Sequence, residues 1–192
     1  MNKKTVALTE DQYKKIITTI KKGFVMHDGK IVKPNNRIAT ILMLEANLGL
    51  RVSDILQLSL SSIIRDGSRF RLNIIEKKTR KQREFTVPLE IYTFMQEYAL
   101  DNNISPKSRL FQIQERTVQN HLQLVCEYLG YENISTHSFR KFFATSIYIS
   151  NNYNIELVRI LLQHSSVATT QRYIGIRGKE IEEALQKHIM LV

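Results

Sequence analysis

Apolar side chains recur at helical spacing along most of this chain of 192 residues. A first amphipathic helix is expected to follow Thr9, which forms a capping-box pattern with Gln12, and to end at Gly23. The segment 24–34 contains an Asp-Gly pair and a late proline and predicts a loop. A second helix is expected from residue 35 or 36 to Gly49. Apolar faces predict further helices near residues 91–98, 118–129, 137–147, 155–162 and 179–189.

Between residues 69 and 87 the apolar pattern changes to a period of two. Polar residues at 69, 71 and 73 alternate with apolar residues at 70, 72 and 74, and a second alternation covers 84–87 before Pro88. Such alternation predicts an antiparallel hairpin. Several helices around one short sheet predict a mostly helical α+β fold with a small antiparallel sheet.

The charge of the chain indicates the kind of partner it binds. Lysine and arginine number 28 against 18 aspartates and glutamates, which gives a formal charge of +10. A cationic surface gains affinity for polyanions by contacting phosphates and releasing counterions. The composition therefore favours a nucleic-acid partner over simple basic solubility.

Cysteine usage and the N-terminal residues indicate a reduced, cytoplasmic setting. Cys126 is the single cysteine, which excludes an intramolecular disulfide and a zinc site of several thiolates. Polar residues 9–11 interrupt the short apolar run after the basic N-terminus, so this run is not a signal peptide. No stretch approaches the roughly 20 apolar residues of a membrane span.

A dense group of basic residues lies in the turn region of the predicted hairpin, at positions 77–83. A charged run of this kind is usually a solvated face. On a hairpin it is held as a fixed object that can enter a groove or follow a nucleic-acid backbone. We therefore expect DNA contacts from Lys77, Arg80, Lys81 and Arg83.

Two arginines have the surroundings expected of phosphate ligands. His137 and Arg140 are three residues apart, so on a helix they project from one face and can reach one phosphate. Arg51 follows Gly49 at a helix terminus or tight turn, where a short backbone holds the side chain. A pair of guanidiniums matches the non-bridging oxygens of a phosphodiester, on which charge grows in a pentacoordinate transition state.

Tyr173 is the candidate nucleophile for such a phosphate. It follows the polar residues 169–172, which argues against a position in the core. A free phenol has a pKa of about 10, so it needs a base or neighbouring cations to attack at neutral pH. His137 is the natural base, and Arg51 and Arg140 would favour the phenolate.

The remaining candidates concern the leaving group and the phosphate. The leaving 5′ oxygen needs a proton, which a lysine of the basic hairpin can deliver. Lys78 is the first choice, with Lys77 and Lys81 as adjacent rivals. His164 either hydrogen-bonds the scissile phosphate or is a helix C-terminal histidine favoured by the helix dipole.

These motifs occur in an order that closely resembles the tyrosine recombinases, also called the phage integrase family. The match runs through Gly-Leu-Arg-Val-Ser-Asp, a hairpin lysine before Val-Pro-Leu, His-x-x-Arg, Leu-x-x-His-Ser-Ser and a tyrosine nine residues later, over nearly the whole chain. The resemblance implies an activating set and a nucleophile, which are Arg51, Lys78, His137, Arg140, His164 and, as the nucleophile, Tyr173.

The chain departs from the family pattern at two positions. Gln163 stands where many members carry glycine, and Lys141 stands where many carry histidine. Neither residue belongs to the activating set, so activity is expected to survive. The hairpin between Lys78 and Pro88 is slightly longer than usual, which leaves the choice among the lysines open.

The resemblance also implies a domain organisation. Residues 1–192 are expected to form a single catalytic domain, without the N-terminal DNA-clamping domain usual in the family. The chain is then either the catalytic part of a longer integrase or a naturally short recombinase similar to the fimbrial-switch invertases. Without a clamp, DNA binding is expected to be weak and salt-sensitive. Residues 178–192 present an apolar face that is expected to dock on a neighbouring protomer.

The implied function is site-specific recombination of double-stranded DNA through a 3′-phosphotyrosyl intermediate, in a protein of a bacterium, a phage or a mobile element. No cofactor or metal is implied, since the arginines and Lys78 supply the positive charge. The implied assembly is a homo-oligomer on DNA, a tetramer in the synapse and a monomer in solution. Two alternatives stay open, a type IB topoisomerase-like DNA relaxer and a catalytically silent DNA-binding regulator. The presence of all six catalytic residue types argues against the regulator.

Overall fold

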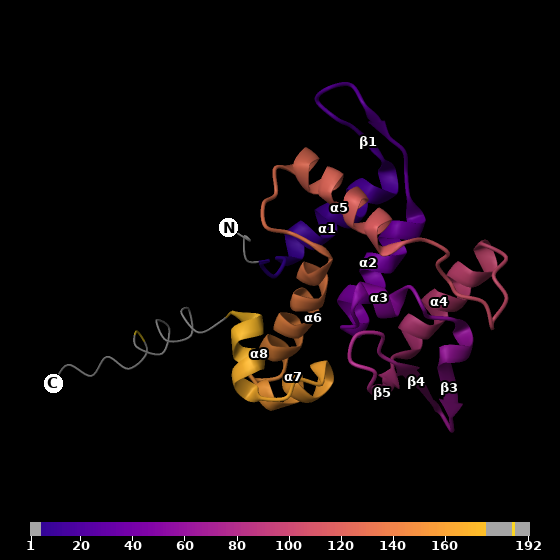
Figure 1. Cartoon of the computed structure of the whole chain (residues 1–192), viewed down its shortest axis with the longest axis vertical. Helices are drawn as coiled ribbons and strands as arrows, with labels where there is room; N and C mark the ends of the chain where they lie inside the picture. Colours follow the sequence, from indigo (N-terminus) through magenta and orange to yellow (C-terminus); the bar gives the residue numbers. More distant parts are fainter. Residues whose placement is uncertain (1–4, 176–185, 187–192) are drawn as a thin grey trace.

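The computed structural model describes residues 5–175 and residue 186 (Figure 1). The helices are α1 (Glu10–Lys22), α2 (Asn36–Leu48), α3 (Val52–Ile55), η1 (Leu60–Ser62, a 3₁₀ turn), α4 (Leu89–Asp101), α5 (Glu115–Leu129), α6 (Thr136–Ser150), α7 (Ile155–Leu162) and α8 (Val167–Ile174). The strands are β1 (Phe24–Val25), β2 (Ile31–Val32), β3 (Ile63–Asp66), β4 (Arg69–Ile75) and β5 (Gln82–Val87).

The predicted α+β architecture is confirmed, and the first helix forms for the predicted reason. The Thr9 hydroxyl accepts a hydrogen bond from the Gln12 backbone N–H, and the Gln12 side chain accepts one from the Thr9 N–H. This capping box satisfies two of the N–H groups that a helix start leaves unpaired. Gly23 then ends α1 with a φ of 72°.

Several short elements were not expected from the sequence pattern. The predicted loop 24–34 contains a small hairpin in which β1 pairs with β2, and β3 adds a third strand to the predicted β4–β5 hairpin. The short helices α3 and α8 were not expected either. Each of these elements is too short for its apolar period to stand out, so tertiary packing decides it. The helix expected at 179–189 and the docking segment 178–192 fall outside the described residues, apart from Gln186.

Side chains of α6 belong to both hydrophobic cores of the molecule. The larger core includes residues of α1, α2, α4 and α5, and Phe139 of α6 is part of it. A smaller core lies around α7 and α8, and Ala144 and Tyr148 of α6 contribute to it. Arg140 therefore stands at the joint between the two cores. Figure 1 shows α6 reaching from the α1–α2–α5 group to the α7–α8 pair.

The three-stranded sheet is antiparallel in the order β3-β4-β5 and is packed on α4. Leu72 of β4 is fully buried opposite Phe85 of β5, and the Phe70 ring stacks on Tyr92 of α4 with 4.1 Å between ring centroids. The β4–β5 turn is thereby carried on a rigid base. Within the described residues, no helix is long and apolar enough to cross a membrane.

Gly49 makes the sharp bend between α2 and α3. Its φ is 60°, in the left-handed region that disfavours residues with a Cβ atom. A Cβ added at this position would lie 2.3 Å from Cδ1 of Phe143 on α6. The bend places Arg51 at the N-cap of α3. Glycine here thus serves both the backbone turn and the close approach of α2 to α6.

Gly49→Ala is expected to lower the free energy of unfolding by about 3 kcal/mol, because it adds a steric clash to the backbone strain. The matched control is Gly130→Ala at the end of α5, which has a φ of 69° and open space within 4 Å of an added Cβ atom. This control carries only the strain and is expected to lose about 1 kcal/mol. Urea unfolding of both variants measures the difference, and equal losses would contradict the role assigned to Phe143.

Candidate active site

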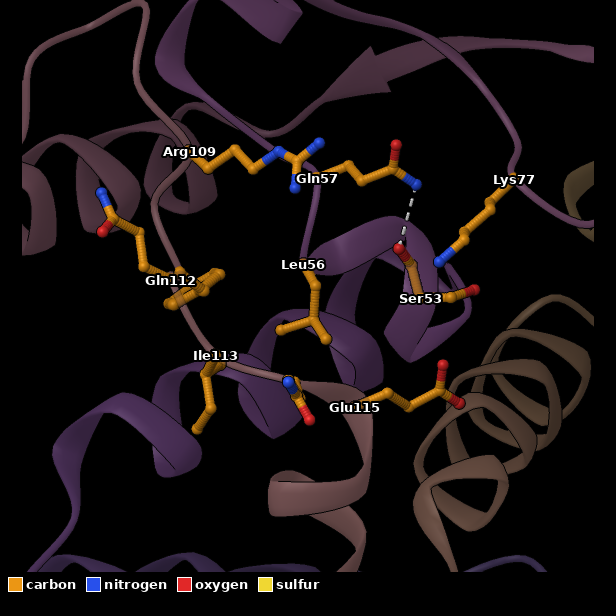
Figure 2. Close-up of a pocket in the computed structure, with 10 residues that line it drawn as sticks. Ser53, Leu56, Gln57, Lys77, Arg109, Gln112, Ile113 and Glu115 are labelled. Carbon is orange, nitrogen blue, oxygen red and sulfur yellow. Dashed lines mark hydrogen bonds between the residues drawn. The ribbon is translucent and has the colours of Figure 1, made fainter.

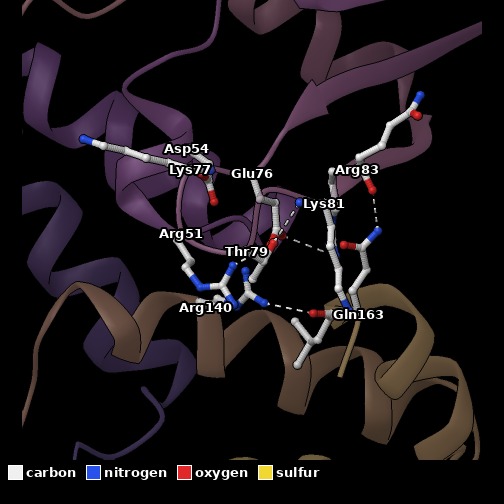
Figure 3. Close-up of polar contacts among 11 residues, drawn as sticks. Arg51, Asp54, Glu76, Lys77, Thr79, Lys81, Arg83, Arg140 and Gln163 are labelled. Carbon is white, nitrogen blue, oxygen red and sulfur yellow. Dashed lines mark hydrogen bonds and ion pairs between the residues drawn. The ribbon is translucent and has the colours of Figure 1, made fainter. Parts of the chain in front are cut away.

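A buried carboxylate, Glu76, joins the arginines of the site. Its Oε2 accepts hydrogen bonds from Arg51 Nη1 at 2.6 Å and from Thr79 Oγ1 at 2.8 Å, and its Oε1 lies 3.9 Å from Arg83 Nη1 (Figure 3). Burial alone would favour the neutral acid, but the hydrogen bonds from Thr79 and Arg51 and the two guanidinium charges lower the pKa of Glu76. Glu76 is therefore an anion that orients Arg51.

A second acid, Asp54, fixes the start of the β4–β5 turn. Its Oδ1 accepts a hydrogen bond from the Lys77 backbone N–H at 2.8 Å, while its Oδ2 is buried with no partner among the described residues. Burial raises the pKa of Asp54, opposed by the Lys77 N–H. Because Asp54 lies in the helix that Arg51 caps, one short element holds both the arginine and the turn that carries Lys78.

Arg140 is buried between α6 and α7 yet keeps unused hydrogen-bond donors. Its side chain is 2% exposed, and Nη2 donates to the Leu162 carbonyl at 3.2 Å. Nη1 of Arg140 has no hydrogen-bond partner within the described chain. Nε and Nη1 of Arg83 have none either, although Nη1 of Arg83 forms a long ion pair with Glu76. Burial, together with the charge of Arg140, lowers the pKa of Arg83 to about 10. Unpaired buried donors are costly, so the site is well suited to an anion.

The structure moves Arg83 away from the position predicted for it. Arg83 was expected in the exposed basic turn as a DNA contact, but it lies in β5 with its guanidinium 2% exposed and 5.2 Å from the centroid of the Phe85 ring. Strand alternation turns it inward, toward Glu76. Lys77, Arg80 and Lys81 are exposed, as the predicted DNA contacts require.

Tyr173 lies in the last turn of α8, with its ring packed against the smaller core. The ring is only partly buried, so Tyr173 is not a core residue, as its polar neighbours in the sequence predicted, and Arg172 beside it is exposed. The phenol oxygen is buried and has no hydrogen-bond partner of good geometry within the described residues. Burial raises the pKa of Tyr173, and the charges of Arg140 and Arg51 act against this rise. The phenol is thus neutral in the free protein.

Two side chains contact the Tyr173 ring. The His164 ring meets it edge-on, with 5.2 Å between centroids and an interplanar angle of 79°. Lys141 Nζ lies 5.3 Å from the tyrosine centroid and also donates to the Thr5 carbonyl at 2.6 Å. In the sequence Lys141 stands out only as a departure from the family pattern, and no local signal shows that it reaches Tyr173.

His164 follows the end of α7, where Gln163 adopts a left-handed conformation with a φ of 54°. The Gln163 side chain donates to the Gln82 carbonyl of β5 at 2.9 Å, which ties the α7–α8 segment to the sheet (Figure 3). Burial, with the charges of Arg140, Arg51 and Arg83, lowers the pKa of His164 to about 4. His164 is therefore neutral at physiological pH in the free protein.

His137 and Lys78 lie at the edge of the same site. His137 occupies the first turn of α6, and partial burial with the charges of Arg140, Arg51 and Lys78 lowers its pKa. Lys78 is exposed on the β4–β5 turn. The adjacent Lys77 extends instead into a surface pocket of about 620 Å³, where Figure 2 shows it pointing toward Ser53. After burial and the two arginines, the charge of Lys78, rather than that of Lys77, contributes to the lowered pKa of His137.

The structure thus brings four of the predicted residues into one region, Arg51, Arg140, His164 and Tyr173, with His137 and Lys78 at its edge. Sequence reasoning missed the roles of Glu76, Asp54 and Thr79. The available signal was the presence of one acid, Glu76, between the strand β4 and the basic turn. Within the described part of the chain, no group of three or more histidine, cysteine, aspartate or glutamate side chains is placed to hold a metal ion.

Comparison with known proteins finds similarity to integrases and recombinases. Residues 7–180 match the model of the phage integrase family. The chain is 29% identical over 154 residues to the probable integrase/recombinase YoeC of Bacillus subtilis, covering 76% of this chain and 81% of that protein. It is 28% identical over 200 residues to tyrosine recombinase XerC of Caldanaerobacter subterraneus, covering 95% of this chain but only 51% of that protein.

Solved structures share the fold at lower sequence identity. The crystal structure of XerA recombinase superposes with a TM-score of 0.66 at 21% identity, covering all of this chain and 66% of that one. A post-cleavage complex of the XerH recombinase with its palindromic difH substrate gives a TM-score of 0.69 at 20% identity, covering 96% of this chain and 53% of that one. The chain therefore spans between half and two thirds of these larger proteins.

Glu76→Gln is expected to lower the free energy of unfolding by about 3 kcal/mol at pH 7, because it leaves buried guanidinium charge without its counterion. The pKa of Glu76 is lowered in the folded protein, so the stabilisation is complete above the ordinary value of 4.5 and is lost as the pH falls through the folded pKa. The free energies of unfolding of the wild type and the variant should therefore converge as the pH falls. Urea unfolding of both proteins between pH 7 and pH 3 measures that convergence.

The matched control for this measurement is Glu84→Gln on the neighbouring strand. Glu84 pairs with Arg71 at 2.6 Å, but both side chains are 42% exposed. Exposed pairs contribute about 0–1 kcal/mol, so this variant should stay close to the wild type at every pH. A Glu76→Gln loss that does not change with pH would show that shape rather than charge stabilises the site.

Proposed function

The chain belongs to the phage integrase family, and on this premise we propose that it cleaves and rejoins double-stranded DNA as a site-specific tyrosine recombinase with Tyr173 as its nucleophile. One observation carries the proposal. Three separate chain segments, the start of α3, helix α6 and the α7–α8 region, place Arg51, Arg140, His164 and Tyr173 around one set of unpaired buried donors. A phosphodiester would supply the negative charge and the hydrogen-bond acceptors that these unpaired donors lack.

The arginines would supply transition-state stabilisation. Arg140 has a free Nη1 group, and Arg51 is held by Glu76 through one nitrogen, which leaves its other donors for a phosphate oxygen. Forked guanidinium donors complement the equatorial oxygens of a pentacoordinate phosphorus. Because the charge on those oxygens grows toward the transition state, such donors act more on the rate than on ground-state binding.

The nucleophile would be activated when DNA enters. In the free protein, burial keeps the Tyr173 phenol protonated. In the reaction the phenol O–H bond breaks, its proton passes to a base, and the tyrosine oxygen forms a bond to phosphorus while the bond to the 5′ oxygen breaks. His137 and His164 are both present as neutral imidazoles to receive that proton. The product is a 3′-phosphotyrosyl link and a free 5′ hydroxyl.

Lys78 would protonate the leaving 5′ oxygen. Its neighbour Lys77 is anchored through its backbone to Asp54 and extends into the surface pocket beside Ser53, whereas the charge of Lys78 contributes to the lowered pKa of His137. Lys77, Arg80 and Lys81 would contact the DNA backbone, where lysine and arginine contribute affinity without reading sequence. The rigid hairpin holds these cations in fixed positions.

Recombinases that share this fold suggest how the chain would assemble on DNA. A lambda integrase that shares this fold is described as a dimer bound to its core site, and XerH is described as bound to its palindromic difH substrate. We propose for this chain a homo-oligomer on DNA, a tetramer when two sites are joined.

Strand transfer between two differently labelled duplexes distinguishes a recombinase from a DNA relaxer, because a relaxer rejoins its own ends.

Tyr173→Phe is expected to abolish covalent attachment to DNA while leaving DNA affinity within about twofold, since one phenol oxygen is removed from a packed ring. The measurement is trapping of the protein on a nicked duplex that carries a site already located by footprinting. Tyr153→Phe, an exposed tyrosine of the same C-terminal half, is the control and should form adduct at the wild-type rate. An equal yield of adduct from Tyr173→Phe would refute the assignment of the nucleophile.

Lys78→Met is expected to slow cleavage of ordinary DNA by about 100-fold, the typical contribution of a general acid. A duplex with sulfur in place of the 5′ bridging oxygen has a leaving group that needs no proton, so on this substrate the variant should approach the wild-type rate. Lys77→Met is the matched control and should respond equally to both substrates. Sulfur rescue of Lys77→Met instead of Lys78→Met would move the role to Lys77.

A further inference from the structure

The hydroxyl of Thr170 lies between the site histidine and the helix backbone. Thr170 is fully buried in α8, and its Oγ1 is 3.1 Å from His164 Nδ1 and 3.3 Å from the carbonyl oxygen of Ser166. A threonine hydroxyl has one proton to donate and lone pairs with which to accept. It can therefore donate to only one of these two partners.

The count of hydrogen bonds favours donation to Ser166. In that arrangement the Thr170 hydroxyl donates to the Ser166 carbonyl and accepts a hydrogen bond from an Nδ1–H of His164, so both contacts are hydrogen bonds. In the opposite arrangement the hydroxyl donates to Nδ1 and its contact with the Ser166 carbonyl is no longer a hydrogen bond. Threonine hydroxyls in helices commonly donate to the carbonyl four residues earlier, as Thr170 does here.

The charge around His164 favours the same arrangement. The positive charges that act on its ring are those of Arg140, Arg51 and Arg83. A neutral imidazole with its proton on Nδ1, toward Thr170, presents the lone pair of Nε2 to the rest of its surroundings. The other tautomer would put a proton on Nε2, adding the positive end of an N–H dipole to a ring that already feels these positive charges, and would leave no Nδ1–H to donate to Thr170.

We propose that Thr170 is a positioning residue that holds neutral His164 as the Nδ1–H tautomer and so keeps Nε2 unprotonated and able to accept the proton of the reacting phenol. The role in catalysis rests on the proposed recombinase function, whereas the tautomer does not. In this state His164 can receive a proton at Nε2, and the proton of the Tyr173 phenol is the one the reaction releases. Once Nε2 is protonated, the imidazolium can donate to a phosphate oxygen.

The tautomer is measured directly by nitrogen NMR of the full chain without DNA. Long-range proton–nitrogen spectra of uniformly ¹⁵N-labelled protein at pH 7.5 distinguish a protonated from an unprotonated ring nitrogen, and the His164 signals are those absent from His164→Gln. The wild type should show a protonated Nδ1 and an unprotonated Nε2. A wild-type His164 protonated on Nε2 would overturn the proposal.

Three substitutions separate the hydroxyl from the packing of the helix. Thr170→Val keeps the buried shape without the acceptor and is expected to shift His164 toward the Nε2–H tautomer, while Thr170→Ser restores the wild-type spectrum. Thr169→Val is the matched control, since the Thr169 hydroxyl contacts Ser166 Oγ and not His164. An unchanged tautomer in Thr170→Val, in a protein shown to be folded by circular dichroism, would also overturn the proposal.

Cleavage of the nicked duplex provides the second readout. Thr170→Val is expected to form the covalent adduct at least about tenfold more slowly in a single turnover, with unchanged DNA affinity and with recovery in Thr170→Ser, as for other residues that fix a catalytic histidine tautomer. Adduct formation by Thr170→Val at the wild-type rate would refute the catalytic role. If the wild-type protein formed no adduct, the proposed function would fail while the NMR result would still decide the tautomer.

Discussion

Burial of positive charge is the constraint on which the rest of this structure depends. Arg83 and Arg140 are each 2% exposed, and Glu76 is the carboxylate in contact with Arg83 and with the neighbouring Arg51. Charges removed from water are unfavourable unless they are paired and hydrogen-bonded. The unpaired donors of Arg140 and Arg83 would therefore be stabilised by hydrogen bonds to an anion. A phosphodiester would supply both the charge and the acceptors.

The same charges set the protonation of the reacting groups. Burial keeps the Tyr173 phenol neutral, and the arginines and burial together keep His164 unprotonated, with a pKa of about 4. A bound phosphate would offset the arginine charges and raise the pKa of His164, which would make proton uptake by the imidazole more favourable. The free protein thus holds a neutral phenol and a neutral imidazole side by side, and a bound phosphate would change the charge around them.

The position of Arg140 within the site depends on helix α6. Arg140 stands between Phe139 of the larger core and Ala144 of the smaller one, so its position depends on both cores. Gln163 adds a second connection, from the end of α7 to β5. A left-handed conformation disfavours a residue with a side chain, typically by about 1 kcal/mol. Here that side chain makes a hydrogen bond to the sheet that glycine could not make.

The sequence by itself determined the long helices, the basic hairpin and the residue types of the site. Helical period and capping patterns predicted α1, α2, α5 and α6 because these signals are local, and the ordered motifs brought the family and its candidate residues into view. Only the tertiary structure decided that Arg83 points inward to Glu76, that α8 packs the Tyr173 ring against the smaller core, and that Thr170 meets His164. These contacts depend on how strands and helices pack against one another, and their energies come from burial and charge pairing that form only in the folded protein.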